Sequence, residues 1–169
     1  MFVPPDESFV HESKFWRINH NGSARLEGYL MLGSTDGGVY DFPDLSPEAL
    51  SEFGHVISLA TQAIRECFQP KHVFVGRYGC APGFEFHLHI IPVYPWLEDR
   101  ILADSRYDCL GELVEVSNGL GFDAADYLLY TWRELVERGD QCGLPEIDMR
   151  KVVGQLRMAI SRNISKNKS

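Results

Sequence analysis

The chain has 169 residues, of which 44% are hydrophobic and 24% charged, as expected for one globular domain with an ample core. Its formal net charge of −8 argues against a broad nucleic-acid surface, which needs many Lys and Arg side chains. No charge-free stretch is long enough for a membrane-spanning helix, and the first residues lack the pattern of a signal peptide. The four cysteines form no CxxC pair. We therefore expect a soluble, cytoplasmic protein with reduced cysteines.

Four strands are predicted in the first part of the chain. Residues 13–19 and 27–32 contain aromatic and aliphatic side chains typical of strands, and an Asn-Gly pair between them favours a turn. Residues 73–78 and 84–91 have the same character, and the Gly- and Pro-containing segment 79–83 between them reverses the chain. Two prolines soon after residue 91 are expected to end the last strand.

A helix is predicted over residues 47–68. Ser46 is a suitable N-cap, a proline occupies the first helical position, and apolar residues then recur with helical spacing until the next proline. Beyond residue 96 the patterns are weaker. They predict helices over 122–138 and 146–162 and a short strand over 110–116.

Together these elements predict an α+β fold, in which a helix packs on one face of an antiparallel sheet. The whole chain, residues 1–169, is expected to form one domain. Its core would cover residues 13–96, followed by a helical extension over about 97–162 and a frayed tail at 163–169.

The most informative segment is the last predicted strand. Side chains alternate across a strand, so Glu85, His87 and His89 are expected to share one face. The other face would carry the apolar side chains Phe86, Leu88 and Ile90. Three adjacent titratable groups are costly to bury unless they are exposed, liganded or hydrogen-bonded. This face is therefore the candidate site, although a solvated histidine pair remains the simpler interpretation of a lone His-x-His.

In this order of elements the segment resembles the motif of the histidine-triad (HIT) proteins. That motif is His-φ-His-φ-His-φ-φ, often followed by proline, where φ is apolar. Aligned with it, Glu85 takes the first histidine position, His87 the second and His89 the third. The strand at 28–32 and the Asp-Leu-Ser-Pro-Glu segment at 44–48 fit the family as well, so the resemblance rests on an order of elements as well as on the motif.

The resemblance covers residues 13–96 and implies a HIT-like fold and nucleotidyl transfer. His87 would attack the α-phosphorus of a nucleoside phosphate, such as a dinucleoside polyphosphate or an adenylyl conjugate. Water would then release the nucleoside monophosphate from a nucleotidyl-histidine. His89, when protonated, would bind a non-bridging phosphate oxygen and assist the leaving group. The family resemblance further implies a homodimer and no cofactor.

Around the two histidines, four residues are expected to have supporting roles. Glu85 would hold or orient His87, and Arg77, Cys80 and Gly83 would help to bind the nucleotide phosphate. The chain also departs from the family pattern, because Glu85 replaces the first histidine. The Asn and Gln that usually line the phosphate are missing before the motif. The sequence therefore leaves open a second function, a nucleotide-binding module that has lost catalysis.

Two further alternatives concern the same region and the C-terminal extension. Glu85, His87 and His89 on alternate strand positions could chelate a metal ion, with Cys80 as a fourth ligand. The cupin metal pattern, however, needs an acidic residue soon after the His-x-His, and the next one here is Glu98. The aromatic stretch at 127–136 is predicted to lie in the core or to form a dimer contact.

Overall fold

A computed structural model describes residues 6–78, 84–108 and 122–166. Five strands form one sheet in the order β1-β2-β3-β5-β4, and every neighbouring pair is antiparallel. The arrangement is an α+β fold, as predicted. The strands are β1 (Phe9–Glu12), β2 (Trp16–His20), β3 (Leu30–Ser34), β4 (His72–Gly76) and β5 (His87–Val93).

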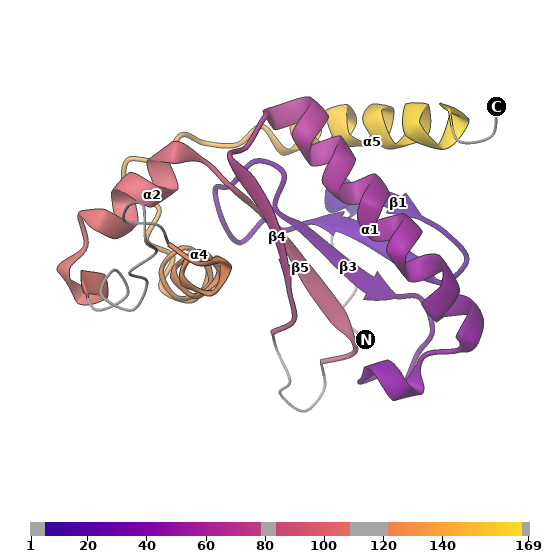
Figure 1. Ribbon diagram of the computed structural model, residues 1–169. Coiled ribbons are helices and arrows are strands. Elements are labelled where there is room, and N and C mark those ends of the chain that lie inside the picture. The colour runs from indigo at the N-terminus through magenta and orange to yellow at the C-terminus, as the bar shows by residue number, and fades with distance from the viewer. Residues whose placement is uncertain (1–5, 79–83, 109–121, 167–169) are drawn as a thin grey trace, which may run out of the picture.

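Helices lie on both sides of this sheet (Figure 1). In the figure, α1 and α5 run together on one side, and α2 and α4 lie together near the end of β5. A π-helical segment, η4, continues directly from α4. The helices are α1 (Pro47–Phe68), α2 (Pro95–Leu102), α4 (Ala124–Tyr130), η4 (Thr131–Glu137) and α5 (Met149–Lys166), and short 3-10 turns include η2 (Phe42–Asp44) and η3 (Ser105–Tyr107).

Helix α1 has the bounds that the sequence predicts. The Ser46 hydroxyl accepts a hydrogen bond from the Ala49 N–H at 3.1 Å, which satisfies a backbone donor of the first turn. At the other end Gln69 takes a left-handed conformation with φ of 49°. The expected burial of the apolar positions of this helix holds for Ile64, whereas Leu50 is 45% exposed and Val56 is buried as well.

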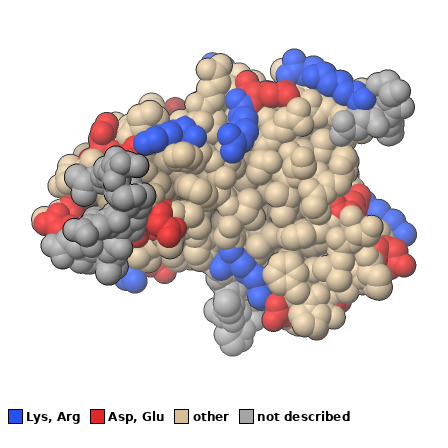
Figure 2. All heavy atoms as spheres, viewed as in Figure 1, with Lys and Arg blue, Asp and Glu red and all other residues tan. Residues whose placement is uncertain are grey.

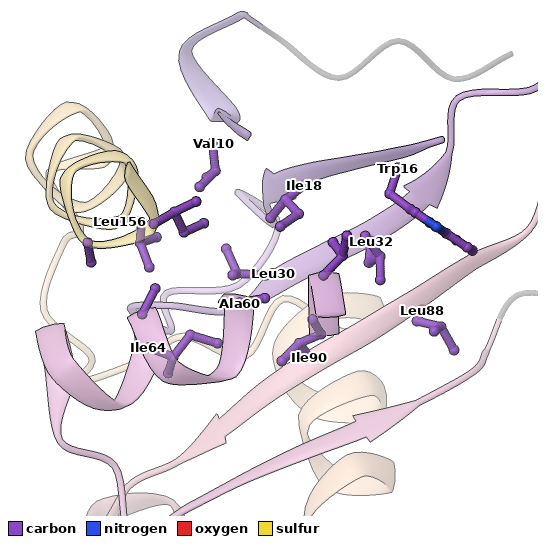
Figure 3. Packing of buried hydrophobic residues seen from close by; sticks show 14 of the residues in the cluster. Val10, Trp16, Ile18, Leu30, Leu32, Ala60, Ile64, Leu88, Ile90 and Leu156 are labelled. Atoms are coloured by element: carbon purple, nitrogen blue, oxygen red, sulfur yellow. The ribbon is translucent and has the colours of Figure 1, made fainter. Parts of the chain in front are cut away.

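The main hydrophobic core lies between the sheet, α1 and α5 (Figure 3). Alternate residues of β5, Leu88 and Ile90, point into it. The indole of Trp16 is fully buried there and donates to the Ala49 carbonyl at 3.0 Å. Because one face of β5 supplies this core, the intervening residues of the strand must face the opposite side.

A second core covers part of that opposite face. Ile91 and Val93 of β5 pack with residues of α2, α4 and η4, among them Leu97, Ile101, Tyr127, Leu128, Tyr130 and Leu135. Most of the aromatic stretch at 127–136 is therefore core, which is one of the two predicted outcomes. The part of the C-terminal extension that forms α2 and α4 lies near the end of β5 (Figure 1).

Several element boundaries differ from the sequence prediction. The first two predicted strands begin later, at Trp16 and Leu30, and β1 and α2 are additional elements. Strand β5 continues through Pro92 to Val93, because Pro92 still has a register partner in β4. Helix α5 extends to Lys166, where a tail was expected to begin at 163. The strand predicted at 110–116 lies outside the described residues.

Two features of the described residues concern the environment of the protein, namely the distribution of surface charge and the length and apolarity of the helices. On the face shown in Figure 2, acidic and basic side chains are interspersed over a mostly uncharged surface. Within the described ranges, no helix combines the length with the apolarity that crossing a membrane requires.

Candidate functional site

His87 and His89 lie on the face of β5 opposite α1. Their ring centroids are 5.1 Å apart and the rings meet edge to face. His87 is partly exposed, whereas His89 is only 1% exposed. In register, His89 stands opposite Met31 of β3 and Gly76 of β4. The two histidines thus share one face, as predicted. His87 is partly open to solvent, and His89 is covered.

The orientation of the His87 ring is set by the backbone. Its Nδ1 lies 2.8 Å from the carbonyl oxygen of Glu85. A carbonyl can only accept, so Nδ1 must carry the proton of this hydrogen bond. In the neutral ring, Nε2 then holds the lone pair. His87 therefore presents a nucleophilic nitrogen in a defined orientation.

The Glu85 carboxylate makes a different contact. Its Oε1 accepts a hydrogen bond from the Gly38 N–H at 3.2 Å. Glu85 precedes β5, so it is not part of the regular alternation that was expected to align it with the histidines. It is the Glu85 carbonyl that orients His87, a role that any residue type at this position could fill.

His89 is enclosed by aromatic rings. The centroids of Tyr29, Tyr78 and Trp132 lie 5.8, 5.1 and 5.3 Å from that of His89. Its Nδ1 is 2.8 Å from the Tyr29 hydroxyl. Burial, together with the nearby His87, lowers the pKa of His89 to about 3. At pH 7 the His89 ring is therefore neutral, in contrast to the expectation of a protonated phosphate ligand.

Tyr78 and Trp132 cover His89 from two parts of the chain. Their rings stack at 6.1 Å with an interplanar angle of 19°. Gly76 makes room for Tyr78, because a Cβ there would lie 3.0 Å from the Tyr78 hydroxyl oxygen. Neither residue was expected in the site from the sequence. Trp132 is far from β5 in the sequence, so no local spacing relates the two. Only the fold brings Trp132 to His89.

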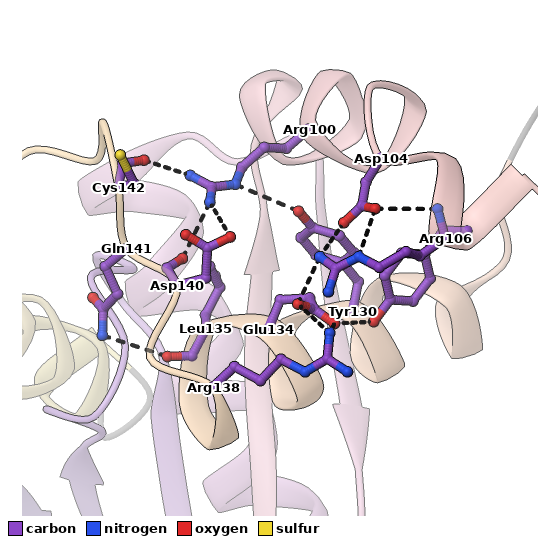
Figure 4. Close-up of polar contacts among 11 residues, drawn as sticks. Arg100, Asp104, Arg106, Tyr130, Glu134, Leu135, Arg138, Asp140, Gln141 and Cys142 are labelled. Atoms are coloured by element: carbon purple, nitrogen blue, oxygen red, sulfur yellow. Dashed lines mark hydrogen bonds and ion pairs between the residues drawn. The ribbon is translucent and has the colours of Figure 1, made fainter.

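A polar network holds the segment that carries Trp132 (Figure 4). Glu134 of η4 is 1% exposed and accepts hydrogen bonds from Tyr107, Arg106 and Arg138. Burial alone raises the pKa of Glu134, but the bonds from Tyr107 and Arg138 outweigh it, so that the pKa lies below its usual range. The Glu134 carboxylate is therefore ionised, and it anchors η4 to the turn η3, which carries Arg106 and Tyr107.

The other predicted phosphate ligands are not brought to the histidines. The Arg77 guanidinium bonds the Asp41 carboxylate at 2.7 Å and the Tyr40 carbonyl, and it lies over the Phe86 ring. Phe86 belongs to the core under α1, on the other side of the sheet from His87. Cys80 and Gly83 lie outside the described residues.

The described residues offer no support for a metal centre at this position. Among them, no three His, Cys, Asp or Glu side chains lie together so that they could hold a metal ion. The Glu85 carboxylate is turned to Gly38, and Cys80 is not among the described residues.

Solved structures share this architecture. The chain is similar to a HIT-like protein from Bartonella henselae involved in cell-cycle regulation (12% identity, 93% of this chain and 87% of that one, TM-score 0.53). It is also similar to a zinc-bound histidine triad family protein from Mycobacterium smegmatis (14%, 96% and 89%, 0.55) and to a uridylyltransferase (11%, 94% and 42%, 0.54). No family model and no curated protein matches the sequence. The chain thus has a HIT-like fold, as its sequence predicted.

Proposed function

We propose that the protein is a HIT-like hydrolase or transferase that moves a nucleotidyl group from a nucleoside phosphate to His87 and then to water. The observation that carries the proposal is the 2.8 Å hydrogen bond between His87 Nδ1 and the Glu85 carbonyl, because it leaves Nε2 free to attack. The fold shared with histidine triad proteins and with a uridylyltransferase supports the choice of substrate class. A dinucleoside polyphosphate or an adenylyl conjugate fits this class.

The reaction takes place in two displacements at the α-phosphorus. In the first, the Nε2 lone pair of His87 forms a P–N bond while the bond from phosphorus to the leaving group breaks. The Nδ1 proton stays on the ring, where the Glu85 carbonyl stabilises the positive charge that develops. In the second, a water oxygen replaces His87, its proton passes to solvent, and the nucleoside monophosphate leaves.

A covalent intermediate is the decisive test. Enzyme in excess is mixed with diadenosine tetraphosphate labelled at the α-phosphate and quenched in base, in which phosphoramidates survive. We expect labelled protein from the wild type and none from His87→Ala. His55→Ala is the matched control, because His55 is an exposed residue of α1, and it should label like the wild type. Unchanged turnover in His87→Ala contradicts the mechanism.

A nucleotide-binding module without catalysis is the second candidate. It is favoured by the placement of Arg77, whose guanidinium is occupied by Asp41 and Tyr40 and does not supply charge at the histidines. Calorimetry with a nucleoside monophosphate and with diadenosine tetraphosphate separates the candidates. Binding with full recovery of the intact tetraphosphate supports the module, and absence of binding excludes both functions.

The proposal also includes a homodimer in the cytoplasm, as the resemblance to the family implies. Sedimentation equilibrium tests the oligomeric state directly. A monomer at all concentrations would remove the dimer from the proposal without affecting the reaction at His87.

A further inference from the structure

The two ring nitrogens of His89 have unequal surroundings. Nδ1 lies 2.8 Å from the hydroxyl oxygen of Tyr29, a residue that is itself fully buried. Nε2 is also buried, and within the described ranges it has no hydrogen-bond partner. A buried N–H or lone pair without a partner costs about 1–3 kcal/mol, so this atom needs an explanation.

The donor and acceptor strengths of the two groups decide the direction of the bond between Tyr29 and His89. A phenol O–H is a stronger donor than a neutral imidazole N–H, and an imidazole nitrogen is a stronger acceptor than a phenol oxygen. The Tyr29 hydroxyl therefore donates to His89 Nδ1, and the proton of the neutral ring lies on Nε2. Burial raises the pKa of Tyr29, so the hydroxyl keeps the proton that it donates.

We propose that Tyr29 is a positioning residue, which holds His89 as the neutral tautomer with its proton on Nε2, so that Nε2–H can donate to a phosphate oxygen of the substrate. This role rests on the proposed function. It connects the segment between β2 and β3, which carries Tyr29, to the site through the bond from the Tyr29 hydroxyl to His89 Nδ1.

The two histidines then have complementary functions. His87 presents a lone pair on Nε2, because its proton is held on Nδ1 by a carbonyl. His89 presents a proton on Nε2, because its lone pair on Nδ1 is held by a hydroxyl. Their rings are 5.1 Å apart, so a phosphate at His87 lies beside the donor. A neutral donor suits this enclosed position better than a charged one, since burial penalises the imidazolium.

Nitrogen NMR of the histidine rings tests the tautomer without any need for activity. In the wild type we expect His89 to show a protonated Nε2 and an unprotonated, hydrogen-bonded Nδ1. Tyr29→Phe removes only the hydroxyl, and the Nδ1 signal should move to that of a free lone pair. Tyr94→Phe is the matched control, because the Tyr94 hydroxyl bonds the Glu27 carbonyl at 2.7 Å and does not bond His89. It should leave the His89 signals in place.

Turnover of diadenosine tetraphosphate supplies the second measurement. Tyr29→Phe should lower kcat about tenfold with KM little changed, which is less than the 10²–10³ for removing a transition-state donor outright. A protonated Nδ1 in the wild type overturns the proposal, and so does an Nδ1 signal that Tyr29→Phe leaves unmoved. Absence of turnover in the wild type defeats the proposed function instead, and the NMR comparison still decides the tautomer.

Discussion

The side chain of His87 is hydrogen-bonded to the backbone of Glu85. The imidazole Nδ1 of His87 donates to the Glu85 carbonyl at 2.8 Å, while the Glu85 carboxylate accepts from Gly38 at 3.2 Å. The part of Glu85 that orients His87 is therefore independent of the side chain. A chain that lacks the first histidine of the HIT motif still has the contact that holds its second histidine.

The first prediction follows from this contact. Glu85→Gln keeps the carbonyl and an oxygen that can accept from Gly38, so we expect kcat/KM to stay within about threefold of the wild type, less than 1 kcal/mol of activation free energy. The measurement is steady-state hydrolysis of diadenosine tetraphosphate, with His87→Ala as the inactive reference. A loss of about a hundredfold or more would assign the carboxylate a part in the reaction.

A second prediction concerns the aromatic cover of His89. Trp132→Ala removes one of the rings that enclose the histidine, and burial is the main reason that the pKa of His89 is as low as about 3. The pKa of His89 should therefore rise toward that of a solvated histidine, about 6.5. A proton NMR titration of the histidine signals measures it.

Trp96→Ala is the control for this change. Trp96 is also a partly buried tryptophan stacked on a tyrosine, Tyr94, at 6.3 Å. It lies on α2, and its removal should leave the titration of His89 unchanged. If Trp132→Ala also leaves it unchanged, Trp132 does not control the environment of this ring.

Local sequence patterns predicted the parts of the fold that depend on local interactions. Helix α1 was predicted with the correct bounds, because Ser46 and a first-turn proline define its start and a proline follows its end. The placement of His87 and His89 on one face follows from strand alternation alone. These features need no knowledge of distant residues.

The missed parts of the site depend on contacts between distant segments. Tyr29 and Trp132 approach His89 only when the sheet forms and the C-terminal extension folds back over it. The sequence pattern placed Arg77 near the motif, but its partners Asp41 and Tyr40 hold it on the other face. Glu85 was expected to act through its carboxylate because backbone carbonyls have no sequence signal.

A third prediction tests the network under Trp132. Glu134→Ala leaves the Tyr107 hydroxyl without its acceptor and separates Arg106 and Arg138 from their common partner. The two arginines remain about half exposed and can be hydrated, so the cost should be smaller than for a fully buried pair. We expect the free energy of unfolding to fall by about 2–3 kcal/mol, measured by urea denaturation.

Glu137→Ala provides the comparison on the same segment. Glu137 pairs with Arg133 at 3.5 Å, and both side chains are about half exposed. Its loss should change the free energy of unfolding by less than about 1 kcal/mol. Equal effects of the two substitutions would contradict the anchoring role of Glu134.

The fourth prediction is that acid destabilises the protein through two buried histidines. Burial lowers the pKa of His89 to about 3 and that of His20 to about 4, whereas both titrate near 6.5 in the unfolded chain. Below pH 6.5 the unfolded state therefore binds protons that the folded state does not. Each histidine then removes about 1.4 kcal/mol of stability per pH unit, until the pH reaches its folded pKa.

Urea denaturation between pH 6 and 5 measures this slope while most carboxylates are still ionised. His89→Gln cannot titrate in either state, so the slope should fall by about 1.4 kcal/mol per pH unit, whatever the variant's absolute stability. His20→Gln should have the same effect, because His20 is also buried, with its Nε2 accepting the Gly28 N–H at 3.2 Å. A wild-type slope retained by His89→Gln would mean that His89 is solvated in the folded protein. In that case Tyr29 and Trp132 would not enclose it, and a neutral donor beside His87 would have no structural basis.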